Sequence, residues 1–100
     1  MNNETKISKI TVKDIADFIR LDEIDEVEMK HLHDSINIAK SYISNYTGIS
    51  IDKLDDYPDF VLALKVLCQD MYDNRALYID KNNPNELVKT ILNMHSINYL

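Results

Sequence analysis

The residues best able to do chemistry in this 100-residue chain are one cysteine, three histidines and a run of acids. Glu28 and His31 have the Glu-x-x-His spacing of metal ligands in carboxylate-bridged helical bundles, but such a site needs a second copy of the motif and the sequence has none. His31 and His33 project about 200° apart on a helix, so they cannot hold one ion together. We therefore expect no metal site and interpret the histidines as solvated or interface residues.

Cys68 is a second candidate, because a thiolate beside a histidine can act as a nucleophile. Its helical neighbours Leu64, Leu67 and Met71 are apolar, which favours a small core residue instead. The single glycine cannot build a glycine-rich phosphate loop, and no serine stands in a nucleophile elbow. We expect no cofactor and no enzymatic activity.

Acidic residues concentrate in the segment 22–28. They are Asp22, Glu23, Asp25, Glu26 and Glu28. Negative charge here favours the positive end of a helix that begins in the same segment, and the segment is also a candidate exposed surface. The whole chain has a net charge of −6, so no sequence-wide attraction favours tight binding of DNA.

The elements that position these residues are predicted to be helices. The chain is 45% hydrophobic with one glycine and two prolines, which is typical of a helical domain and too poor in turn residues for a many-stranded β fold. Thr11 and Asp14 have the spacing of a capping box, which predicts a short helix over about 12–20. We expect residues 1–10 to be a mobile tail and residues 11–100 to be one helical domain.

A long helix is predicted over about 25–46, and it would be about 33 Å long. Apolar residues at steps of three and four form one stripe along it: Met29, Leu32, Ile36, Ala39, Ile43 and Tyr46. Gly48 follows as the expected left-handed stop. A helix with one apolar stripe must pack along other helices or along another copy of itself.

Two further helices complete a small bundle of about four. The third begins at Pro58, runs to about Tyr78 and has a wide apolar arc, so we expect it to be the central core element. This arc consists of Phe60, Val61, Ala63, Leu64, Leu67, Cys68, Met71 and Tyr72. The fourth is predicted to begin with Asn83 as its cap, Pro84 in the first turn and Glu86 at the third position. Its apolar side would consist of Leu87, Val88, Ile91 and Leu92.

Six tyrosines are many for this length, and tyrosine suits protein interfaces. Tyr42, Tyr46 and Tyr72 lie near the predicted core stripes, so half-buried packing is an equal alternative. We expect Asn74 and Arg75 to fix the turn after the central helix, with Tyr72 packed beneath them.

A single cysteine gives no intramolecular disulfide, which fits a reducing cytoplasm. The longest apolar run, Phe60–Leu64, is far shorter than the about 20 residues that span a bilayer. The first residues lack the apolar stretch of a signal peptide. The sequence therefore predicts a chain that is neither inserted in a membrane nor exported by that route.

Several segments in order resemble the head–tail connector proteins of long-tailed bacteriophages. They are Ile10–Lys13, Phe18–Asp22, Ala39–Gly48, Pro58 at the start of the third helix, and Tyr72–Arg75, which is similar to the Tyr-x-Asn-Arg signature of that family. The resemblance covers roughly residues 10–95. The chain departs from the family pattern at Ala76, where an acid is expected, and at Met94 and His95, where a Tyr-Arg pair often closes the last helix.

The resemblance implies a small helical adaptor, often labelled a DNA packaging protein, that completes the virion neck after assembly in the bacterial cytoplasm. Its partners would be the portal protein, a tail-side connector or stopper protein, and copies of itself in a dodecameric ring. A monomer in solution is compatible with this role. DNA would pass through the channel without tight binding, and the acidic segment 22–28 would be a candidate channel-side surface.

Two other classes of function compete with this interpretation. An acidic helical regulator, such as an antirepressor or DNA mimic, would use its carboxylates to occupy a basic partner. A small helical enzyme would need a pocket with convergent polar groups, and the periodic positions contain no such cluster.

Overall fold

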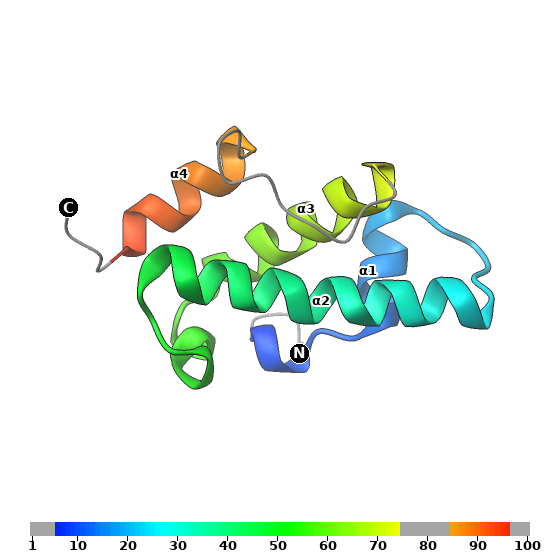
Figure 1. Cartoon of the computed structure of the whole chain (residues 1–100), viewed down its shortest axis with the longest axis horizontal. Helices are drawn as coiled ribbons and strands as arrows, with labels where there is room; N and C mark the ends of the chain where they lie inside the picture. Colours follow the sequence, from blue (N-terminus) through cyan, green and yellow to red (C-terminus); the bar gives the residue numbers. More distant parts are fainter. Residues whose placement is uncertain (1–5, 75–84, 97–100) are drawn as a thin grey trace.

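A computed structural model of the chain describes residues 6–74 and 85–96 (Figure 1). Within these residues the secondary structure is entirely helical and contains no strand, which confirms the predicted all-α fold. The elements in chain order are a 3₁₀ helix Ile7–Lys9, α1 Val12–Ile19, α2 Glu26–Thr47, a 3₁₀ helix Ile51–Asp56, α3 Asp59–Asn74 and α4 Glu86–His95.

Helix α1 begins and ends as its sequence dictates. The Asp14 amide donates to Thr11 Oγ1 at 3.2 Å, and the Thr11 amide donates to Asp14 Oδ2 at 3.0 Å, so the predicted capping box is confirmed. The helix stops at Arg20, whose backbone is left-handed with φ 71°, and the Leu21 amide then donates to the carbonyl of Ala16 at 2.9 Å. This Schellman arrangement turns the chain away from the helix axis.

Helix α2 lies within one residue of its predicted bounds. Asp25 is the cap and accepts from the Glu28 amide at 2.8 Å, while Gly48 ends the helix with φ 80°. Four residues of the predicted stripe are buried: Leu32, Ile36, Ala39 and Ile43. Met29, the first residue of the stripe, is 46% exposed, so the helices of the single chain do not bury it. The reason is that the first turns of α2 project past the ends of α1 and α3 (Figure 1).

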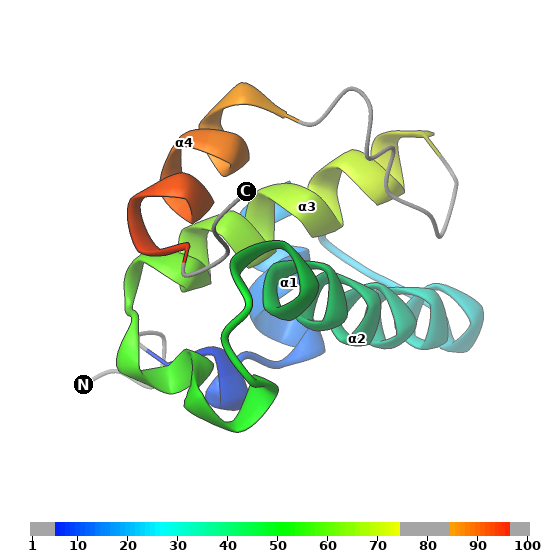
Figure 2. The same ribbon diagram turned by 60° about the vertical axis from the view of Figure 1, so that its left-hand side comes forward.

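Helix α3 is the central element, as predicted. It packs against α1, α2 and α4 (Figures 1 and 2). Its arc is buried at Phe60, Val61, Ala63, Leu64, Leu67, Cys68 and Met71. The predicted continuation of this helix beyond Asn74, to about Tyr78, falls outside the described residues.

Helix α4 begins later than predicted. Its cap is Asn85 and not Asn83, because the Oδ1 of Asn85 accepts from the amides of Leu87 at 2.9 Å and Val88 at 3.3 Å. Residues 83 and 84 lie outside the described residues. Val88, Ile91 and Leu92 are buried, whereas Leu87 is 47% exposed and does not belong to the buried side.

The packed domain begins earlier than residue 11. Ile7 and Ile10 are buried in the common core, and Ser8 donates from its amide and its hydroxyl to the carboxylate of Asp55, at 2.9 and 2.6 Å. These two bonds join the first 3₁₀ helix to the second. The second 3₁₀ helix forms part of the predicted connector, and its Leu54 is buried. The predicted tail of residues 1–10 was therefore too long, and residues 1–5 lie outside the described part.

Candidate functional site

The acidic segment 22–28 forms the link between α1 and α2. Asp22, Glu23, Asp25 and Glu26 are exposed, as expected for a surface segment. Asp25 is used as the cap of α2, and the half-buried Glu28 accepts from the hydroxyl of Tyr72 at 3.3 Å. The segment thus divides into residues that fix the helix and residues that face solvent.

The carboxyl end of α3 is joined to its neighbours by polar side chains. The Nδ2 of Asn74 donates to the carbonyl of Asp70 at 2.8 Å within α3, and the turn that Asn74 was predicted to fix lies outside the described residues. Burial raises the pKa of Asp70, a hydrogen bond from Asn85 lowers it in part, and nearby Asp73 raises it again. Tyr72 reaches α2 through its bond to Glu28. The role predicted for Arg75 falls outside the described residues.

Tyr42 and Tyr46 lie in contacts within the molecule. Their ring centroids are 5.9 Å apart, and the hydroxyl of Tyr46 donates to Asn93 Oδ1 at 2.9 Å, which connects α2 with α4. Tyr42 is buried, and this burial together with the nearby Tyr46 raises its pKa. Of the two alternatives left open by the sequence, packing is favoured over an interface for Tyr42.

The thiol and the histidines do not converge on one centre in the described residues. Cys68 is buried, and burial raises its pKa to about 12, which keeps the thiol protonated and unreactive as expected for a core residue. His31 and His33 are exposed on α2. No group of three or more possible metal ligands occurs among residues 6–74 and 85–96.

His95 forms a cluster that the sequence did not predict. Its Nε2 lies 3.0 Å from Asp59 Oδ2, and its ring packs against Tyr57 and Phe60 with centroids 5.0 and 5.4 Å apart. These contacts join the carboxyl end of α4 to the start of α3. His95 and Asp59 are 36 positions apart, so no local pattern could indicate the pair.

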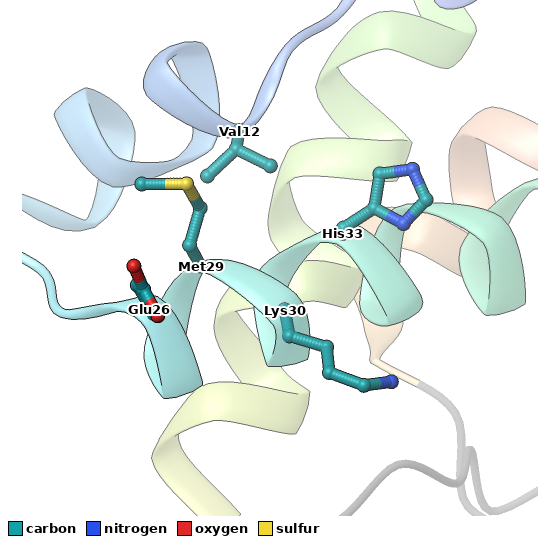
Figure 3. Close-up of a pocket in the computed structure, with 5 residues that line it drawn as sticks. All are labelled: Val12, Glu26, Met29, Lys30 and His33. Atoms are coloured by element: carbon teal, nitrogen blue, oxygen red, sulfur yellow. The ribbon is translucent and has the colours of Figure 1, made fainter.

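An apolar depression lies where α1 meets the first turns of α2. Val12 of α1 and Met29 of α2 point toward each other, with Glu26 and His33 on either side and Lys30 turned away (Figure 3). One open hollow of about 390 Å³ is lined by these five residues. A second of about 440 Å³ shares Val12 and Met29 and extends along α1 to the link. Its further lining residues are Thr11, Lys13, Ala16, Asp17, Leu21, Asp22 and Ile24.

The charges around this depression are unevenly compensated. Lys13 pairs with Asp17 at 3.1 Å, and Lys30 pairs with Asp34 at 3.4 Å, each one helical turn away. No ion pair engages Asp22, Glu23 or Glu26 within the described part of the chain. The result is an apolar floor with a net negative rim.

We call this feature the Met29 hollow; its floor comprises Val12, Ala16, Leu21, Ile24 and Met29, and its acidic rim comprises Asp22 and Glu26. The rim acids belong to the segment that was predicted to be exposed, whereas Met29 belongs to the predicted apolar stripe of α2. The sequence did contain a signal for the exposure of Met29. The preceding segment is a run of acids, so it offers few apolar neighbours that could cover the first turn of the helix.

The comparisons add no relatives. No helix in the described residues is long and apolar enough to cross a membrane. Family models, curated proteins and solved structures were each compared with the chain, and none of them matches it.

Proposed function

We propose that this chain is a non-enzymatic assembly subunit, and specifically a head–tail connector of a tailed bacteriophage. It would form a ring beneath the portal, extend the DNA channel, and dock tail-side proteins as DNA packaging is completed. The similarity of residues 10–95 to connector proteins supports this proposal, as does one observation on the fold.

That observation is the uncovered amino end of α2. The carboxyl half of the helix is buried along α3 and α4, whereas Val27 is 62% exposed and Met29 46% exposed at the other end. Exposed apolar side chains on a rigid helix are typical of surfaces that become buried on association. These two side chains add little to the core of the single chain. In an assembly subunit they would be buried against a partner.

The net negative charge of the chain also supports a role in lining a passage for DNA. A dodecamer with −6 per copy carries about −72, and a negative wall repels phosphates, so DNA would move through the ring without sticking. The same acidity suits a regulator that mimics DNA, and the decisive experiment must distinguish the two.

The experiment mixes the purified chain with the portal protein encoded by the same genome and examines the mixture by sedimentation and negative-stain microscopy. We expect co-sedimentation and a ring on the portal. Val27→Asn should weaken this ring, while Ile51→Asn is the matched control, because Ile51 is 51% exposed but lies in the second 3₁₀ helix.

Three outcomes would overturn the proposal. One is a chain that ignores the portal and instead competes with DNA for a DNA-binding protein. Another is a particle whose neck is complete when this chain is absent. The third is turnover of a small molecule by the purified chain.

A further inference from the structure

We infer that the Met29 hollow is a docking site for a protein segment that presents apolar side chains flanked by lysine or arginine. This inference rests on the proposed function in one respect, namely that the chain works by binding other proteins. It goes further by assigning the surface and the chemistry of the partner.

The floor of the Met29 hollow provides the apolar part of the site. Val12 and Met29 approach each other from two helices, and Leu21 and Ile24 extend the apolar surface into the link. Leu21 and Ile24 are only partly buried, so a bound side chain would cover apolar surface that is still in contact with water. The hollow is open and shallow, which suits one or two side chains of a larger partner.

The supports of the hollow are rigid. The capping box fixes the start of α1 next to Val12, and the Asp25 cap fixes the start of α2 one turn before Met29. The left-handed Arg20 sets the direction of the link between them. A site built on two capped helices does not need to order itself when the partner arrives.

Charge decides which partner fits. Each lysine that lines the hollow is paired with an acid one helical turn away, whereas no ion pair engages the lining acids Asp22 and Glu26 among the described residues. An acidic segment, a phosphate backbone or an anionic lipid surface would be repelled, whereas a basic segment would be attracted and oriented. Leu87 and Met94 are also exposed, but they lie on α4 and do not line this hollow.

The probe is a synthetic helical peptide with leucine on one face and lysine on the other. Binding to the full chain is measured by fluorescence anisotropy, and the methyl signals of Val12, Met29 and Met94 are followed by NMR. We expect saturable binding that moves the signals of Val12 and Met29 and leaves that of Met94 in place. Affinity should fall as salt is raised from about 0.05 to about 0.5 M, because the rim charges are exposed.

Two variants separate the two parts of the site. Met29→Ser removes apolar floor and should weaken binding about tenfold, while Met94→Ser is its matched control at a 66% exposed methionine. The double variant Asp22→Asn and Glu26→Gln should weaken binding about fivefold and flatten the salt dependence. Asp52→Asn with Asp56→Asn changes the same charge on another exposed surface and should have no effect.

Peptide controls complete the test. A peptide with glutamate in place of lysine should not bind, and a scrambled peptide of the same composition should bind more weakly. Equal affinity for the Met29→Ser and Met94→Ser variants, or NMR shifts that map away from Val12 and Met29, would overturn the inference. The NMR shifts are measured on the unaltered chain, so the location of the bound peptide does not depend on how well any variant folds.

The outcome is distinguishable from a failure of the proposed function. A chain that assembles on the portal but does not bind the peptide at the Met29 hollow retains its connector role and loses this site. A chain that binds the peptide at the hollow but ignores the portal retains the site and loses the connector role.

Discussion

The two halves of α2 belong to one continuous helix but meet different surroundings. Its carboxyl half is buried at Ala39, Tyr42, Ile43 and Thr47, and is covered by α3, α4 and the second 3₁₀ helix. Its amino half is buried at Leu32 and Ile36 and is bonded to α3 through Glu28, but its first turns leave Val27 and Met29 exposed to solvent. The comparison teaches that one helix can serve stability at one end and remain available for binding at the other.

The largest expected effect is at the buried half. Ile43 is fully buried, so Ile43→Ala should lower the free energy of unfolding by about 2–5 kcal/mol through lost burial and a cavity. Urea unfolding followed by circular dichroism measures this. A loss below about 1 kcal/mol would mean that the carboxyl half is not the stabilising half.

A smaller effect is expected at the last residue of the helix. The hydroxyl of buried Thr47 donates to the carbonyl of Ile43 at 2.8 Å and accepts from the Ile49 amide at 3.2 Å. Thr47→Val keeps the shape but leaves that amide unsatisfied, which should cost about 1–3 kcal/mol. Thr90→Val, at an exposed position of α4, is the control and should change stability little.

At the amino end, the cap should contribute to stability. Asp25→Ala removes the acceptor of the Glu28 amide and should destabilise the chain by about 1 kcal/mol in thermal or urea unfolding. Asp22→Ala removes a carboxylate of the same link that caps nothing. If both variants lose equal stability, the cap does not explain how this end of α2 is fixed.

Beneath the carboxyl half, the Ser8–Asp55 contact should make stability depend weakly on pH. The two hydrogen bonds from Ser8 lower the pKa of Asp55 below its ordinary value of 3.8. The stabilisation is therefore present above that value and is lost as pH falls through the lower pKa of the folded state. Ser8→Ala should reduce the slope of unfolding free energy against pH in this acid range, whereas Asp56→Asn, at an exposed neighbour, should leave the contribution of Asp55 in place.

The smallest expected effect on stability is at Val27. Because Val27 is 62% exposed, Val27→Asn should change the free energy of unfolding by less than about 0.5 kcal/mol. The same variant should weaken assembly on the portal. A variant that assembles normally would show that the exposed end of α2 has no part in association.

Local rules explain what could be predicted from the sequence. The capping box of Thr11 and Asp14 and the left-handed stop at Gly48 depend on neighbouring residues alone, so both are confirmed within the helices that they delimit. The wide arc of α3 likewise predicted its central place. Asn85 replaced Asn83 as the cap because a run of asparagines offers several acceptors and the local rule cannot choose among them.

What could not be predicted depends on contacts between distant segments. Met29 and Leu87 have the spacing of core residues, yet they are 46% and 47% exposed, because other elements of the described structure cover them only in part. The pairing of His95 with Asp59 and that of Ser8 with Asp55 join segments 36 and 47 positions apart. The Met29 hollow needed both the acids of the link and the failure of the bundle to extend over the first turns of α2.

The burial of Cys68 has a practical consequence for labelling. The chain has one thiol, and its pKa of about 12 inside the core makes it a poor target for alkylating reagents at neutral pH. A cysteine introduced on the surface, for example Val27→Cys or Met94→Cys, would therefore take up a fluorophore or spin label selectively without removal of the native thiol. If the chain forms the proposed ring, distances between its copies could then be measured from either position in an otherwise unaltered chain.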